Sequence, residues 1–332
     1  MVIRSGLGAQ LGIKQETGYG TYGAPDHWYE ITGETLKLKK IPVQGGGIAA
    51  GRTAQLGSRR VVTTWSGLGD VTMEVANKGF GMWLANILGS SAVPVVQGAT
   101  AAYLQTHVLG DNFGKSITLQ KGLPDLGTGT SNPYTFLGGK VVDAEFTGDT
   151  AGILLCKVGL DFKQVVETQP LTAPSYPTSL SPFHGLQMNV RIGPYGAEVA
   201  APGVNKITLK VTRPQNIGRT YAGAAGLKAE PVMNAWTQVT GTFDADYLDK
   251  AVFADKVASD APTSLVVEWI GPIIAGAFAQ TFRIRVPMIF LDTDTPVISG
   301  PDIIKGTFGF TGESDGLNPQ VSCEYMSTDA VV

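Results

Sequence analysis

The chain has 332 residues, of which 16% are charged and 43% hydrophobic, with 43 glycines, 19 prolines and a formal net charge of −3. This length fits two domains of ordinary size, and the composition favours a folded, turn-rich chain of strands and excludes a wholly disordered one. The charge leaves no basic surplus of the kind that binds nucleic acid independently of its sequence.

The N-terminal segment carries no targeting or nucleotide-binding signal. Residues 1–8 lack the basic region, apolar run and cleavage site of a secretory signal, so we expect the chain to fold in a cytoplasm. The glycines of residues 6–12 superficially resemble a dinucleotide loop. Such a loop follows a strand, opens a helix and precedes an acidic residue by about 20 positions, and none of this is found here. We therefore interpret the segment as an N-terminal arm.

Two segments follow the same strand-to-helix pattern. Residues 71–75 form a predicted strand that leads into a helix over 77–88, and residues 241–245 lead into a second helix over 246–258. Each helix carries an apolar stripe at helical spacing and should pack on a sheet. The sequence thus predicts one helix in each half of the chain.

Strict alternation of apolar and polar residues marks the strands. It is clearest over residues 186–192 and 207–211, and it is typical of sheets with one buried and one wet face. We predict an all-β protein in which each domain is a small antiparallel sandwich or open barrel with one helix.

Further matches indicate an internal duplication. Residues 36–39 match 207–210, Trp65 matches Trp236, residues 117–119 match 282–284, and Phe146-Thr147-Gly148 matches Phe310-Thr311-Gly312, each motif preceding a strand with a cysteine, Cys156 or Cys323. Prolines follow one another between the copies, as in a stiff linker. We therefore predict two tandem domains, residues 1–175 and 176–332, each with its own core. Phe146, Gly148, Phe310 and Gly312 form the expected core motif.

Residues suited to catalysis or metal binding do not gather in the sequence. His27, His107 and His184 stand in unrelated segments, and the two cysteines are too few for a zinc site or a disulfide framework. Residues 292–294 lack the glycine and the distal glutamate of a calcium loop. No nucleophile elbow or acid–base pair of carboxylates is recognisable, so we predict no enzyme activity, cofactor or metal. The most apolar stretch, residues 269–279, is too short and broken to span a membrane.

Two glycine-rich segments, residues 44–60 and 214–230, are the strongest candidates for function. Both connect neighbouring strands, both exceed what a hairpin needs, and both stand at the same place in the repeat. They are either surface loops without a function or arms that become ordered against a partner subunit, and we favour arms. The candidate contact residues are Gln44, Gly45, Gly46, Gly47, Arg52, Arg59, Arg60, Arg219 and Lys228.

The chain resembles the tail tube (major tail) proteins of long-tailed bacteriophages. The resemblance lies in residues 8–21, in residues 84–89 at the end of the first helix, in Val286-Pro287 and in the closing residues 310–312. It implies a structural virion protein that self-assembles into stacked rings around the channel for DNA, so that the glycine-rich segments would be inter-ring contacts. It also implies assembly in the host bacterial cytoplasm, tape-measure and tail-terminator proteins as partners, and DNA that passes without specific binding.

The duplication bears on the number of chains in a ring. In the simplest form of the family one domain per subunit makes a six-membered ring. With two tube-type domains per chain, three chains would supply six domains, or the second domain could decorate a six-chain ring. We favour three chains because the second copy keeps its strands, long loop and helix.

A surface-displayed β-sandwich that binds a receptor or a carbohydrate is the alternative function. Such modules usually cluster exposed aromatic side chains on one loop face. The tryptophans of this chain are instead spread over its predicted strands and helices, at Trp28, Trp65, Trp83, Trp236 and Trp269.

Overall fold

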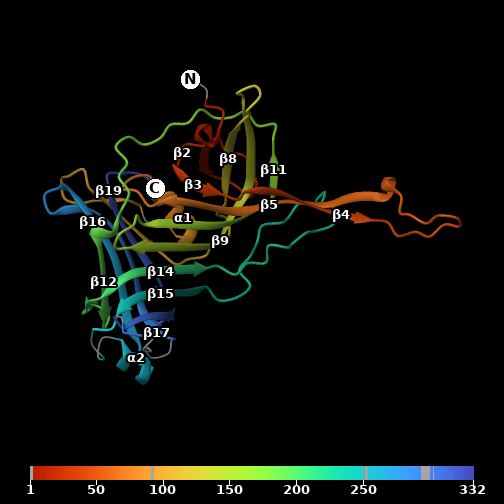
Figure 1. Cartoon of the computed structure of the whole chain (residues 1–332). Coiled ribbons are helices and arrows are strands. Elements are labelled where there is room, and N and C mark those ends of the chain that lie inside the picture. Colours follow the sequence, from red (N-terminus) through yellow and green to blue (C-terminus); the bar gives the residue numbers. More distant parts are fainter. Residues whose placement is uncertain (1–2, 91–92, 249, 251–252, 293–299, 302) are drawn as a thin grey trace.

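The computed structural model describes residues 3–90, 93–248, 250, 253–292, 300–301 and 303–332 (Figure 1). The first half contains β1 (Gln10–Gln15), β2 (His27–Trp28), β3 (Ile31–Glu34), β4 (Lys37–Gln44), β5 (Arg60–Glu74), α1 (Gly81–Leu88), β6 (Val95–Val96), β7 (Tyr103–Val108), β8 (Ile117–Pro124), β9 (Ser131–Asp149), β10 (Leu155–Phe162) and β11 (Gln164–Val166). The second half contains β12 (Met188–Gly193), β13 (Val199–Ala200), β14 (Val204–Thr212), β15 (Gln238–Asp246), α2 (Ala254–Ser259), β16 (Thr263–Ala275), β17 (Phe278–Leu291), β18 (Lys305–Gly312) and β19 (Ser322–Ser327). Short 3-10 turns are η1 (Gly6–Gly8), η2 (Gly57–Arg59) and η3 (Gly185–Gln187). The predicted all-β class is confirmed.

The central feature is an antiparallel ladder that runs through both halves of the chain. Its strands follow the order β4–β5–β10–β9–β14–β15–β18–β17. The halves meet where β9 pairs with β14, with Phe146 opposite Leu209 and Glu145 opposite Lys210. One continuous sheet therefore connects the two halves edge to edge.

The alternation in the sequence gives this sheet two different faces. On β9, Ala144 and Phe146 are buried, whereas Asp143 and Glu145 between them are only partly covered. Successive side chains of a strand point to opposite faces, so the apolar set enters the core and the polar set faces solvent. The same pattern holds along β14, where Ile207, Leu209 and Val211 are buried.

Most of the buried apolar side chains among the described residues form one cluster that draws on both halves. Phe282 of β17 is central to it: its ring lies 5.5 Å from that of Phe146, 6.0 Å from those of Phe80 and Trp269, and 6.5 Å from that of Tyr325. The expectation of a separate core in each half is therefore corrected. The reason is that β9 pairs with β14 and β7 pairs with β19, which places the two halves on shared sheets.

The strand order nevertheless repeats. The first half has the ladder β1–β8–β9–β10–β5–β4, and the second half has β12–β16–β17–β18–β15–β14 in the same antiparallel sequence. Each ladder begins after a 3-10 turn, η1 or η3. The duplication read from the sequence thus has a structural counterpart, while the division at residue 175 stays a prediction.

The pairings correct part of the sequence alignment. They match β9 with β17 and β10 with β18, so Phe146 on β9 and Phe310 on β18 lie on strands with different places in the two halves. The shift arises because β6 and β7 lie between α1 and β8, whereas β16 is the next strand after α2. Both phenylalanine side chains are buried, and a Cβ on Gly148 would meet the Trp269 ring.

Both helices are shorter than the sequence predicts. α1 begins at Gly81 instead of residue 77, because Asn77 exchanges hydrogen bonds with the backbone of Ser181 (2.9 and 3.0 Å). In the second half Asp246 is still the last residue of β15, and α2 begins only at Ala254. Residues 249, 251 and 252 of the predicted second helix lie outside the described residues.

Candidate functional site

A two-stranded ribbon extends from one end of the central sheet. We call residues 37–68 the basic arm: they comprise β4, the connecting loop and the first part of β5, which pair from Lys37 opposite Leu68 to Gln44 opposite Arg60. At about 3.3 Å per residue, the eight residues of β4 make a ribbon about 26 Å long. In Figure 1 it points away from the body of the molecule.

The tip of the basic arm is held by its own contacts. Gly45 N donates to the Arg59 carbonyl (3.0 Å), the Arg59 guanidinium donates to the Gly47 carbonyl (3.0 Å), and Gln44 Nε2 donates to the Leu56 carbonyl (2.9 Å). A Cβ on Gly47 would meet the Arg59 guanidinium, so a larger residue there would displace the Arg59 side chain from this contact. These bonds give the loop a defined shape within a single chain.

The basic arm concentrates positive charge in a chain that is acidic as a whole. It holds Lys37, Lys39, Lys40, Arg52, Arg59 and Arg60 and no Asp or Glu. It also exposes apolar side chains, among them Ile41, Val43, Val61 and a fully exposed Ile48. A two-stranded ribbon is at best marginally stable by itself in water, and exposed apolar side chains on it are typical of a surface that a partner covers.

The second glycine-rich segment behaves differently. Residues 214–230, the second loop, run along the other edge of β5, where Trp65 N donates to the Gly226 carbonyl (3.3 Å). Lys228 forms an ion pair with Asp161 at the end of β10, and both side chains are largely buried. Burial raises the pKa of Asp161, and the hydrogen bond from Lys228 opposes that rise.

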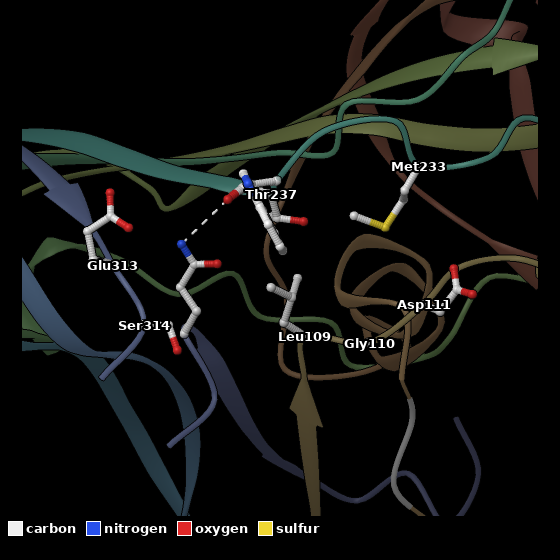
Figure 2. A pocket seen from close by; sticks show the side chains of 9 residues that line it. Leu109, Gly110, Asp111, Met233, Thr237, Glu313 and Ser314 are labelled. Carbon is white, nitrogen blue, oxygen red and sulfur yellow. Dashed lines mark hydrogen bonds between the residues drawn. The ribbon is translucent and has the colours of Figure 1, made fainter. Parts of the chain in front are cut away.

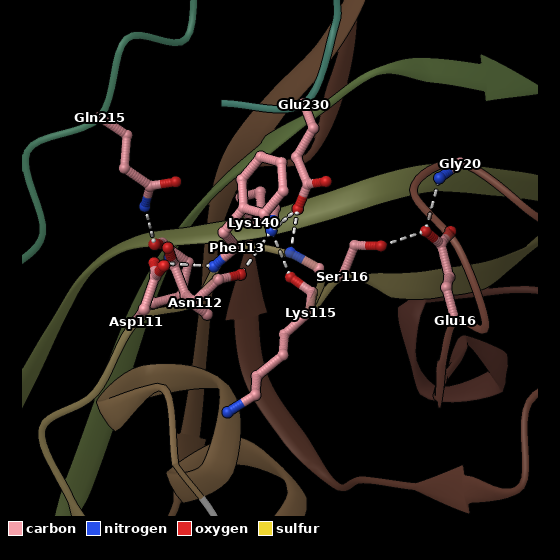
Figure 3. A network of polar contacts seen from close by, with 12 residues as sticks. Glu16, Gly20, Asp111, Asn112, Phe113, Lys115, Ser116, Lys140, Gln215 and Glu230 are labelled. Atoms are coloured by element: carbon pink, nitrogen blue, oxygen red, sulfur yellow. Dashed lines mark hydrogen bonds and ion pairs between the residues drawn. The ribbon is translucent and has the colours of Figure 1, made fainter. Parts of the chain in front are cut away.

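Glu230 fastens the far end of this loop. Its carboxylate accepts a hydrogen bond from the buried Lys140 ammonium (Figure 3). It also accepts one from Gly114 N (2.7 Å). Arg219 in turn donates to the Glu230 carbonyl (2.8 Å) and to the Tyr221 hydroxyl (2.7 Å). Arg219 and Lys228, expected from the sequence as contact residues, are thus engaged within the chain.

A second buried cation joins the two halves nearby. Arg213, which follows β14, donates to the carbonyl of Ile87 in the last turn of α1 (3.1 Å) and to the carbonyl of Gly110 after β7. Burial lowers its pKa to about 10. A cation at a helix C-terminus meets the unpaired carbonyls and the negative end of the helix dipole.

The three histidines considered for a metal site lie apart in the structure. His27 contacts Asp26, His107 is buried on β7 and His184 caps η3, and they belong to separate elements. No group of three or more His, Cys, Asp or Glu side chains in the described part of the chain could hold a metal ion. The segment 6–12 forms η1 and the start of β1 instead of opening a helix. Of the predicted turn 292–294, residues 293 and 294 lie outside the described residues.

The arrangement is therefore one of sheet edges, arms and a polar face, and the comparisons agree with it. A family model described as phage tail tube protein matches residues 6–312. The chain belongs to the phage tail tube protein family. As a tail tube protein it has a structural role in the virion, in a family that is generally non-enzymatic. No curated protein matches the chain. None of the helices in the described ranges is long and apolar enough to cross a membrane.

The sequence did not single out several residues that organise this tail tube protein. Asp161, Lys140, Glu230 and Arg213 form the buried polar contacts that fix the second loop and α1. Arg213 follows the predicted strand 207–211 and Glu230 ends the second glycine-rich segment, whereas no sequence pattern marks Lys140 or Asp161. Trp236 is expected from the sequence on a strand or helix, but it precedes β15 without belonging to either kind of element, and its side chain is 91% exposed.

Proposed function

We propose that three copies of the chain close into a ring and that such rings stack into the tail tube, the conduit for DNA ejection. The proposal rests mainly on the β9–β14 junction, where β14, the last strand of the second-half ladder, pairs with β9, the third strand of the first-half ladder. The same kind of joint between chains, made by β4 as the first-half counterpart of β14 with the second half of a neighbouring copy, would close the sheets into a barrel. Three chains would then supply six ladders.

The open edges of the chain support closure. Among the described residues, β3 and β4 pair only with β5, which leaves their outer edges available. An open sheet edge is a template for pairing with another chain, and a closed ring makes use of it. The lysines on β4 disfavour pairing of this edge with unrelated strands. We therefore expect the strand that pairs with it in the tube to carry acidic side chains.

The polar face of the central sheet suits a channel for DNA. Cross-strand neighbours on this face are Thr72, Lys157, Glu145, Lys210, Thr240 and Thr311, one from each of six successive strands. Acidic side chains outnumber lysines on it, with Asp70, Glu74, Asp143, Asp149, Asp244 and Asp246 beside Lys206 and Lys305. Such a wall repels phosphate weakly and lets DNA slide without specific binding.

In this proposal the basic arm makes the contacts between rings. Its length, charge and exposed apolar residues fit a ribbon that reaches beyond its own ring. The tape-measure and tail-terminator proteins are the further partners proposed, with assembly in the cytoplasm of the host bacterium.

Electron microscopy of the concentrated, purified protein tests the proposal. We expect tubes whose rings contain three chains, with both halves of each chain in the inner wall. Rings of six chains with residues 176–332 wholly outside the inner wall would overturn the three-chain arrangement. A protein that stays monomeric at all concentrations would contradict self-assembly, although the family membership would stand.

A further inference from the structure

An open cavity of about 570 Å³ lies between residues 109–111 of the first half and residues 233–237 and 313–320 of the second half. Leu109 and Met233 form its apolar floor, with Trp236 beside them. Asp111 and Glu313 lie on opposite sides of Leu109 and Met233 in Figure 2, and no Lys or Arg lines the cavity. The site is therefore apolar in its middle and acidic at its rims.

Trp236 is the unusual residue of this cavity. Its side chain is 91% exposed, although a tryptophan normally hides most of its surface. Large aromatic residues beside an apolar cavity are typical centres of protein interfaces. Leu317, in the loop that carries Glu313, is exposed to the same extent.

The repeat shows what a tryptophan at this place can bind. Trp65 is the matching residue of the first half, and there the Lys40 ammonium lies over the ring, 4.8 Å from its centroid. Lys40 reaches it because β4 and β5 stay paired beyond the sheet. In the second half the β14–β15 pairing ends at Thr212 opposite Gln238, before it reaches Trp236, and Pro214 has no N–H to continue it. The Trp236 ring lacks a ribbon of this kind.

We propose that this cavity receives the tip of the basic arm, residues 45–59, from a second copy of the chain. This inference rests on the proposed tube, since it names the place where the arm of one ring docks on the next. An Arg of the tip lies over Trp236 or against Glu313, and Ile48 enters the apolar middle.

Complementary composition supports this occupant over others. The basic arm offers Arg52, Arg59 and the exposed Ile48 without any acid, and the cavity lining offers two acids and three apolar side chains. The buried Arg213 contacts Met233 and Gly110 of this lining but does not itself line the cavity. Opposite charge at the rim steers association and fixes orientation, and apolar contact at the centre supplies affinity. An arm and a cavity at different places on one chain make a head-to-tail contact, which propagates into a stack.

Disulfide trapping tests this docking in the assembled protein. Ile48→Cys chains and differently tagged Glu313→Cys chains are mixed, assembled and oxidised; the native Cys156 and Cys323 are buried and should not react. We expect a disulfide between the two tagged chains. Ile48→Cys mixed with Leu186→Cys, a fully exposed site on η3 outside the cavity, should give none.

The outcomes separate this inference from the proposed function. If tubes form and Ile48→Cys is crosslinked to Leu186→Cys, or to neither Leu186→Cys nor Glu313→Cys, the docking site is wrong. The proposed tube would still stand. A wild-type chain that never assembles would overturn both. As a second measurement, Arg52→Glu should reduce assembly at least tenfold, and Glu313→Lys in the same chain should restore most of it. Failure of that charge exchange to restore assembly would also contradict the site.

Discussion

Lys228 of the second loop and Asp161 of β10 form an ion pair in which 14% and 4% of the side-chain surfaces remain exposed. This contact joins a loop of the second half to a strand of the first. It gives the two glycine-rich segments, which look alike in the sequence, different physical properties: the first projects as the basic arm, and the second lies fastened along β5.

Limited proteolysis should distinguish the two segments. In the unassembled chain we expect trypsin to cut first after Arg52, Arg59 or Arg60, whose side chains are exposed, and only later after Arg219 or Lys228. The reason is that a protease needs locally open backbone, and the second loop is held by buried polar contacts. Mass spectrometry of the first fragments measures the order. Early cleavage after Lys228 would show that the loop is not fastened in solution.

Removing one partner of the buried pair should be costly. Lys228→Met leaves Asp161 buried without its cation, so we expect the free energy of unfolding to fall by about 3–5 kcal/mol in urea denaturation. The exposed pair of Lys14 and Asp26 is the control: Lys14→Met should cost less than about 1 kcal/mol. Equal effects of the two substitutions would rule out a special contribution from the buried pair.

The core residues of the Phe-Thr-Gly motifs should matter independently of their alignment. Phe146→Ala and Phe310→Ala each remove a buried aromatic ring and should destabilise the chain by about 3–5 kcal/mol. Gly148→Ala should also destabilise, because its new Cβ meets the Trp269 ring, whereas Gly33→Ala has open space around it and is the control. Thermal unfolding of the four variants measures this. A Gly148→Ala variant as stable as Gly33→Ala would contradict the packing described.

His107 should make the stability depend on pH. It is buried on β7 beside the Ser90 carbonyl and the Gln105 side chain, and burial lowers its pKa from 6.5 to about 4. The unfolded chain therefore binds a proton at higher pH than the folded one, so stability is full above about pH 6.5 and falls as the pH drops toward 4. The loss is roughly 3 kcal/mol. His107→Gln should flatten this part of the curve of unfolding free energy against pH. An unchanged slope in that variant would assign the pH dependence to other groups.

Deleting residues 45–51 should separate folding from stacking. The tip contributes no buried apolar side chain to the core, so we expect a soluble variant with nearly unchanged unfolding free energy. It should no longer form tubes, because the proposed contact between rings is lost. Circular dichroism and electron microscopy measure the two properties. If this deletion variant forms tubes of normal length, the tip of the basic arm is not needed for the contact between rings.

The sequence by itself determined the class of fold, the duplication and the family. Alternating apolar residues, as in Ile207, Leu209 and Val211, fix which face of a strand is buried, since the side-chain period of a strand is two wherever it lies. The two long glycine-rich segments could likewise be read along the chain. These properties are local, or depend only on the order of segments.

Only the tertiary structure decided which strands are neighbours. The pairing of Phe146 with Leu209 joins residues far apart in the sequence, and no local pattern specifies it, because any alternating strand can pair with any other. The same holds for Lys228 and Asp161, and for the exposure of Trp236, which depends on where the β14–β15 ladder ends. These long-range pairings produce the single core, and they decide that one glycine-rich segment projects while the other lies along β5. Sequence periodicity could not predict either feature for this reason.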